Sequence, residues 1–180
     1  MFRRAWARIL IQLRHMRSAL LVGSLVLCWV STSFADAPSL VGKDAPDFVL
    51  KSLDGTNLRL SEFRGQVVLV NFWARWANDS RREMPALDRI HTTYARAGLV
   101  VLGISIDEDL RRAQEFADSM KVSYPVMFDT GSGVGRDYQL GRLPMTILVD
   151  RSGVVRYSHL GYRRGDDRLY LDHIRELLRE

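Results

Sequence analysis

The segment that most constrains the fold is Gln66–Trp73, which reads Q-V-V-L-V-N-F-W. A continuous run of aliphatic and aromatic residues of this length is typical of a strand that is buried on both faces of a sheet. The next segment, Asn78–Ala97, carries apolar residues at helical spacing, at Met84, Leu87, Ile90, Tyr94 and Ala97. A buried strand followed directly by an amphipathic helix predicts an α/β domain in which helices cover a central sheet.

The rest of residues 42–180 alternates between these two patterns. We expect strands at Asp47–Lys51, Asn57–Leu60, Leu99–Ile106, Pro125–Asp129, Met145–Asp150 and Val154–His159. We expect helices at Glu108–Lys121 and Asp166–Arg179, with Leu110 and Leu169 on their inward faces, and a helical turn at Val134–Leu140. Asp54-Gly55 between the first two strands predicts an N-terminal β-hairpin. This order predicts a central mixed β-sheet with helices on both faces.

Residues 1–35 have the organisation of a cleaved secretory signal peptide. Five arginines and no acidic residue precede the apolar run Ala19–Val30, and Ser33 and Ala35 fit a cleavage site before Asp36. The apolar run has 12 residues, whereas about 20 are needed to span a bilayer. We therefore expect export to the periplasm, with residues 36–41 as a short lead-in and residues 42–180 as one domain. The alternative is an uncleaved segment that anchors the protein in the inner membrane.

Removal of residues 1–35 changes both the charge and the cysteine content of the chain. The sequence has 26 basic and 21 acidic residues, and without the five arginines of the signal segment the two signs are equal in number. A chain without a basic excess gives no support to nucleic-acid binding, so no nucleic-acid partner is predicted. The single cysteine, Cys28, lies in the removed segment. The mature chain therefore has no thiol, and no metal or other cofactor is predicted.

Two separated motifs carry a resemblance to a known family. Residues 68–85 read V-L-V-N-F-W-A-R-W-A-N-D-S-R-R-E-M-P, and residues 141–153 read G-R-L-P-M-T-I-L-V-D-R-S-G. The first resembles the active-site strand and helix of the thioredoxin superfamily, and the second resembles its cis-proline strand and hairpin. The R-E-M-P ending makes the chain most similar to periplasmic thiol–disulfide oxidoreductases of the TlpA/ResA type. The resemblance covers about residues 42–180 and implies a thioredoxin-like fold.

The chain departs from this family at the residues that perform its chemistry. Such enzymes carry W-C-x-x-C, whereas this sequence has Trp76-Ala77-Asn78-Asp79-Ser80. Ala77 stands at the position of the nucleophilic cysteine, and Ser80 stands at that of the resolving cysteine. Neither side chain can form the mixed disulfide through which thiol–disulfide exchange proceeds. We therefore predict a redox-inactive protein without a catalytic residue; the alternative is an active oxidoreductase whose two cysteines were replaced by engineering.

The resemblance leaves in place a surface that can bind an extended polypeptide. In this fold a cis X-Pro bond, here Leu143-Pro144, exposes the backbone of the preceding residue opposite the start of the active-site helix. We expect Leu143 to offer its N–H and C=O beside Trp76, so that a peptide can pair with it as an added strand. Three more residues complete the predicted partner-binding set, namely Asn78, Asp79 and Met145. The expected partner is a periplasmic polypeptide or an assembly partner, and membrane contact is expected only if the signal segment is retained.

The remaining polar residues of this segment have structural interpretations. Ser80-Arg81-Arg82-Glu83 matches an S-x-x-E capping box, which predicts that Ser80 or Asn78 caps the helix and that Glu83 completes the box. Asn71 stands where thioredoxins keep a buried aspartate, and we expect a hydrogen-bonded buried amide there. Asp79 and Glu83 lack the histidine or cysteine support that a metal site would need. A further alternative is an enzyme that uses an external thiol such as glutathione, stabilised by Ser80 or Asn78.

Overall fold

The central strand of the structure is β3 (Val67–Trp73), which is buried along its whole length. The computed structural model describes residues 40–180, so the predicted signal peptide and most of the predicted lead-in lie outside the described residues. The five-stranded sheet has the order β5 (Val126–Phe128), β4 (Leu99–Ser105), β3, β6 (Met145–Val149) and β7 (Val155–Leu160). β3, β4 and β5 pair in parallel, and β6 pairs antiparallel with both β3 and β7. The sheet is therefore mixed, as predicted.

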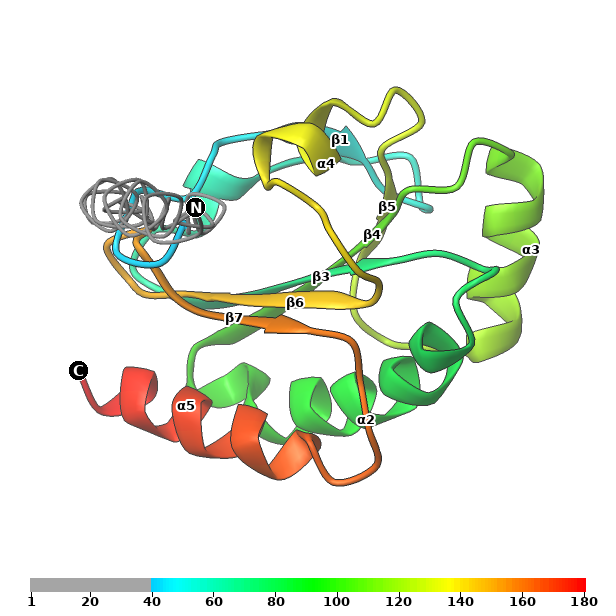
Figure 1. Cartoon of the computed structure of the whole chain (residues 1–180). Coiled ribbons are helices and arrows are strands. Elements are labelled where there is room, and N and C mark those ends of the chain that lie inside the picture. The colour runs from blue at the N-terminus through cyan, green and yellow to red at the C-terminus, as the bar shows by residue number, and fades with distance from the viewer. Residues whose placement is uncertain (1–39) are drawn as a thin grey trace, which may run out of the picture. The chain divides into compact units, whose positions relative to one another are not determined.

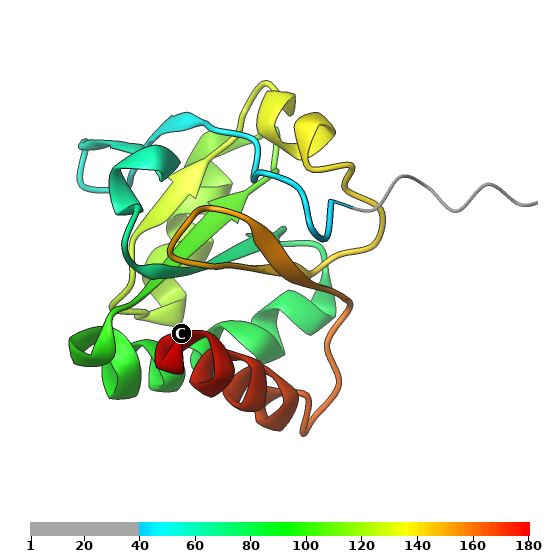
Figure 2. The same ribbon diagram turned by 90° about the vertical axis from the view of Figure 1, so that its left-hand side faces the viewer.

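Helices cover both faces of this sheet, as Figures 1 and 2 show. α2 (Asn78–Tyr94), α3 (Leu110–Met120) and α5 (Asp167–Arg179) share one hydrophobic cluster with one face. The opposite face packs against α4 (Gly133–Asp137), the 3₁₀ turn η1 (Leu60–Phe63) and the antiparallel hairpin of β1 (Val49–Lys51) and β2 (Asn57–Arg59). A short 3₁₀ segment, η2 (Ala95–Ala97), follows α2. The predicted fold class, with its N-terminal β-hairpin, is confirmed.

Two leucines that the sequence predicts on the inward faces of helices are exposed in the structure. Leu110 is 41% exposed and Leu169 is 47% exposed. Both lie in the first turn of their helices, and the buried stripe of α5 runs instead through Tyr170, Ile174 and Leu177. Leu169 is one position before Tyr170, which turns it by about 100° around the helix axis. Within residues 40–180, no helix has the length and apolar character that a bilayer-spanning segment requires.

Two connections bring distant parts of the chain to one end of β3. β3 ends at Trp73, and α2 begins at Asn78 after a short turn. β6 pairs with β3 so that Thr146 lies opposite Asn71. The Leu143-Pro144 peptide bond, which directly precedes β6, is cis. The start of α2 and the segment before β6 therefore lie at the same end of the sheet.

Candidate functional site

The first part of the candidate site lies where β3 passes into α2. Trp73 is fully buried at the end of the strand, whereas Trp76 is 63% exposed. Ala77 is the N-cap of α2, with an extended backbone (φ −87°, ψ 105°), and no side chain from residues 40–180 caps the helix there. Partial positive charge gathers at such a helix end, where a thiolate would be stabilised. Ala77 carries no group that can use this position chemically.

The predicted capping box is wrong. α2 begins at Asn78, so Ser80 is the third helical residue and neither it nor Asn78 is the N-cap. A turn closed by a hydrogen bond from the Ala77 N–H to the Ala74 carbonyl (3.0 Å) starts the helix three residues before the motif indicates. Ser80 is buried, and its Oγ has no hydrogen-bond partner within residues 40–180. Because this hydroxyl is buried, Ser80 is not accessible to an external thiol such as glutathione.

Ser80→Ala distinguishes this arrangement from a capping role. We expect the free energy of unfolding to stay unchanged or to rise by about 1 kcal/mol, because an unpaired buried hydroxyl is destabilising. A capping serine would instead lose about 1 kcal/mol on the same change. The measurement is urea denaturation of both proteins. Ser61→Ala is the matched control, since that hydroxyl donates to Asp47 Oδ2 (3.1 Å), and its removal is expected to lower stability.

The second part of the site is a buried polar cluster around Glu83. The Glu83 carboxyl is fully buried and accepts hydrogen bonds from Asn71 Nδ2 (2.7 Å), Thr146 Oγ1 (2.8 Å) and the Tyr170 hydroxyl (2.7 Å). Asn71 Nδ2 also donates to Thr146 Oγ1 (2.9 Å). Burial raises the pKa of Glu83 to about 7, against the opposing effect of its three donors. Asn71 is thus the hydrogen-bonded buried amide that the sequence predicts, whereas Glu83 is a core residue and not part of a cap.

A signal for the burial of Glu83 was present in the sequence. Glu83 is four residues before Leu87 and seven before Ile90, so it lies on the apolar face of α2. The match to S-x-x-E is a local pattern, and the helical spacing is the stronger constraint because it fixes which face meets the sheet. Tyr170 comes from the far end of the chain, and no short-range pattern connects it to Glu83.

Asp79 lies in an ion-pair arrangement that is separate from Glu83. Its carboxylate pairs with Arg82 Nη1 (3.1 Å) in the same helix and with Arg142 Nη2 (3.8 Å) in the segment before β6. The second pair joins the first turn of α2 to the residue that precedes Leu143. Within residues 40–180 there is no group of three or more histidine, cysteine, aspartate or glutamate side chains that could hold a metal ion.

The segment before β6 offers an unpaired backbone. Within the described part of the chain, neither the N–H nor the C=O of Leu143 has a hydrogen-bond partner, whereas the Pro144 carbonyl accepts from the Gly161 N–H (2.7 Å). Leu143 is half-buried and Asn78 is exposed. Met145 is 6% exposed and pairs with Phe72 and Leu160 inside the sheet, so it is a core residue. Its membership of the partner-binding surface stays a prediction, and a buried strand residue offers a partner little side-chain area.

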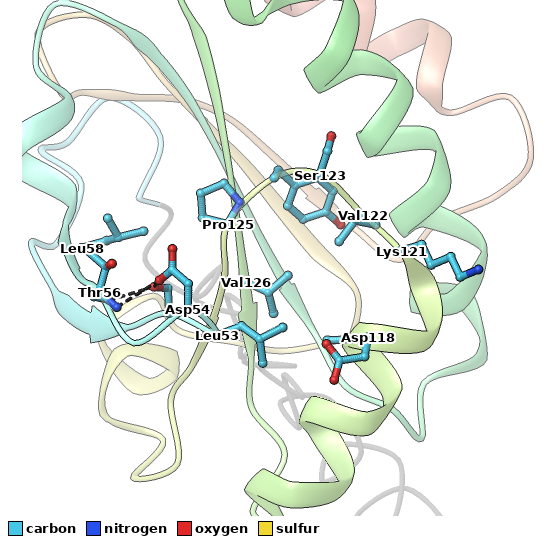
Figure 3. Close-up of a pocket in the computed structure, with 13 residues that line it drawn as sticks. Leu53, Asp54, Thr56, Leu58, Asp118, Lys121, Val122, Ser123, Pro125 and Val126 are labelled. Carbon is cyan, nitrogen blue, oxygen red and sulfur yellow. Dashed lines mark hydrogen bonds between the residues drawn. The ribbon is translucent and has the colours of Figure 1, made fainter.

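A separate pocket of about 480 Å³ lies between the β1–β2 hairpin and the segment that joins α3 to β5 (Figure 3). Its lining combines the apolar side chains of Leu53 and Val126 with the carboxylates of Asp54 and Asp118. Asp54 Oδ1 accepts a hydrogen bond from the Thr56 N–H (3.0 Å) within the hairpin turn. None of the site residues predicted from the sequence lines this pocket, which is not part of the candidate site.

The mixed sheet, the turn from β3 into α2 and the proline segment before β6 together define a protein of the thioredoxin-like class. A solved structure from Chlorobium tepidum, named as the thiol:disulfide interchange protein DsbE, has the same fold, with a TM-score of 0.74 and 30% sequence identity. The alignment covers 77% of this chain and 97% of that chain. The chain belongs to the AhpC/TSA family, whose profile matches residues 41–158.

Curated relatives are similar to most of the chain. The chain is 34% identical over 127 residues to the thiol-disulfide oxidoreductase ResA of Geobacillus thermodenitrificans. The aligned region covers 71% of this chain and 73% of the relative. The chain is 35% identical over 122 residues to the thioredoxin-like protein YneN of Bacillus subtilis, and this alignment covers 67% of this chain and 71% of the relative. The resemblance to the thioredoxin superfamily and to ResA-type proteins is confirmed.

Proposed function

We propose that this protein is an exported, redox-inactive relative of the thiol–disulfide oxidoreductases that binds an extended polypeptide segment. The observation that carries the proposal is the exposed indole of Trp76 and the backbone of Leu143, unpaired within residues 40–180, at one end of the sheet in a site without a thiol. Export is supported by the signal-like organisation of residues 1–35. The names of the relatives describe an activity that this chain lacks the thiols to perform.

Redox inactivity follows from the side chains at the two chemical positions. Ala77 has no nucleophile, and Ser80 has a buried hydroxyl that cannot form a disulfide. The single cysteine of the sequence is Cys28, within the segment whose removal we expect on export. Assay of insulin disulfide reduction tests this part of the proposal. The wild-type protein is expected to give the uncatalysed rate.

Peptide binding follows from the backbone and aromatic groups that remain. A free N–H and C=O on one residue are the two groups that an added strand needs for pairing. An exposed tryptophan can cover the side chains of such a strand, and tryptophan is enriched at the energetic centres of interfaces. The Asp79–Arg142 ion pair (3.8 Å) links the first turn of α2 to the residue next to this backbone.

The charges around the site favour a partner with acidic side chains. Arg75, Arg82 and Arg142 are exposed, and Asp79 is the carboxylate that pairs with the last two. The side chain of Arg75 has no ion-pair partner within residues 40–180. The hydrogen bond of Arg75 to Asp107 Oδ2 (2.8 Å) comes from its backbone N–H. We therefore propose that aspartate-bearing or glutamate-bearing segments bind more tightly than neutral ones.

Trp76→Ala is expected to weaken peptide binding at least ~10-fold, since truncation of a central interface tryptophan costs about 2 kcal/mol or more. The measurement is fluorescence anisotropy of labelled eight-residue peptides of alternating valine and threonine, with and without two aspartates. Leu143→Lys replaces the half-buried side chain of the residue that presents the unpaired backbone, and it is expected to weaken binding of the peptide without aspartates. Leu169→Ala removes an exposed leucine from α5 and is the matched control, expected to leave binding unchanged. Failure of both peptides to bind the wild-type protein would contradict the proposed function.

A further inference from the structure

A second pocket, of about 510 Å³, lies between α2 and the entrance to α5, two helices that lie side by side in Figures 1 and 2. Its lining is Arg89 from α2, and Tyr162, Arg164, Gly165, Asp167 and Arg168 from the segment that enters α5. None of these residues belongs to the Trp76 and Leu143 surface. A pocket of this size is in the range of small-molecule sites in proteins, about 300–1,000 Å³.

The arginines of this pocket are not ion-paired with any described residue, although the Asp167 carboxylate also lines it. Within residues 40–180, the guanidinium groups of Arg89, Arg164 and Arg168 form no ion pair and no hydrogen bond, and Asp167 forms no ion pair with them. A guanidinium keeps its proton at any physiological pH. Three positive charges and one negative charge therefore line a single hollow, where they attract anions.

Tyr162 adds a neutral hydrogen-bond donor to the same pocket. Its side chain is mostly buried, and burial together with the nearby Asp167 carboxylate raises the pKa of its hydroxyl. The phenol thus stays protonated at neutral pH. The hydroxyl has no hydrogen-bond partner among the described residues, so it can donate to a ligand.

An adjoining hollow of about 220 Å³ extends the pocket along the two helices. It shares Arg89 and Asp167 with the first pocket, and its apolar lining comes from Ala86, Ile90 and Leu171. The combined space is larger than a single inorganic anion requires. Its two parts differ in chemistry, since one is cationic and the other is largely apolar.

We propose that the pocket between α2 and α5 binds a small phosphate monoester, with its phosphate among Arg89, Arg164 and Arg168 and an apolar body along Ile90 and Leu171. A phosphate monoester carries a charge of about −1.5 to −2 at pH 7, which matches the excess of two positive charges in the pocket. The planar guanidinium donors match phosphate oxygens in paired hydrogen bonds. A carboxylate matches the donor geometry equally well but supplies only one negative charge.

Isothermal titration calorimetry with phenyl phosphate tests the proposal, with amide NMR shifts used to locate the contact. In low-salt buffer we expect saturable binding with a dissociation constant of about 1 mM or lower. The shifts are expected at Arg89 and at residues 162–168. Phenylacetate, a monoanion of similar shape, is expected to bind at least ~10-fold more weakly, and added salt is expected to weaken both.

Two variants and one control assign the binding to the pocket. Arg89→Gln and Arg168→Gln are each expected to raise the dissociation constant at least ~10-fold, since charge-assisted hydrogen bonds are among the stronger ones. Arg96→Gln changes an exposed arginine of η2 outside both pockets and is expected to have no effect. The proposal is overturned by any of four results: no saturation at about 10 mM ligand, equal binding of phenylacetate, an equal effect of Arg96→Gln, or binding only to vesicles of phosphatidylglycerol and phosphatidylcholine.

Discussion

Replacing Ala77 and Ser80 together by cysteine is expected to turn this protein into a catalyst of disulfide exchange, with insulin reduction about two orders of magnitude faster than with the wild-type chain. Ala77 occupies the N-cap of α2, where no described side chain competes for the first N–H groups of the helix. A thiol at this position would gain the electrostatic stabilisation that lowers a cysteine pKa and supplies thiolate at neutral pH. Ser80 follows one helical turn later, at the spacing of the family's second cysteine.

The single variants separate the two roles. Ala77→Cys alone is expected to form a mixed disulfide with a substrate but not to turn over, because no second thiol releases the product. Ser80→Cys alone is expected to be inert, since residue 80 is buried. A wild-type protein that reduces insulin above background would contradict the proposed redox inactivity. A folded double variant that forms its disulfide yet stays inactive would show that more than the two thiols has been lost.

Glu83→Gln is expected to remove a pH dependence of stability worth about 3 kcal/mol. In the folded protein burial raises the pKa of Glu83 from 4.5 to about 7. Between these two values the folded state holds a proton that the unfolded state has released, so stability falls as pH rises. The contribution of Glu83 is fully present below pH 4.5 and is lost above pH 7. Glutamine keeps the shape of the side chain and an oxygen acceptor but cannot ionise.

Urea denaturation of both proteins between pH 4.5 and pH 8 measures this effect. As pH rises, the wild type is expected to lose stability relative to the variant, because only the wild type carries the ionising Glu83 carboxyl. The titration of all other groups cancels when the two free energies of unfolding are subtracted. Glu108→Gln makes the same substitution at an exposed glutamate and is the matched control. A constant difference for Glu83→Gln over this range would mean that Glu83 ionises at its ordinary pKa.

The strands and helices were predictable because local patterns and burial agree for them. Val67–Trp73 is apolar at every position except Asn71, and a segment of this kind has few alternatives to the centre of a sheet. The helical spacing of the apolar residues in α2 likewise agrees with the burial of the face that packs against that sheet. Local agreement of pattern and burial is what makes a sequence specify its fold.

The candidate site was predictable only in part, because some of its contacts join residues distant in the sequence. Trp76, Asp79 and Leu143 could be selected from motifs. The pairing of Glu83 with Thr146 and Tyr170 could not, since it spans 63 and 87 residues and depends on how β6 and α5 pack. The grouping of Arg89, Arg164 and Arg168 around one pocket could not be predicted either, because it depends on the packing of α2 beside α5.

Trp73 and Trp76 differ in exposure, so the intrinsic fluorescence of the domain reports on two separate regions. Residues 36–180 contain these two of the four tryptophans of the sequence. One indole lies wholly in the core, and the other projects into solvent at the start of α2. The emission of the buried indole changes only when the core opens, whereas that of the exposed indole responds to whatever covers the end of the sheet. Unfolding and partner engagement therefore produce separable changes in intrinsic fluorescence, and no external dye is needed to follow either.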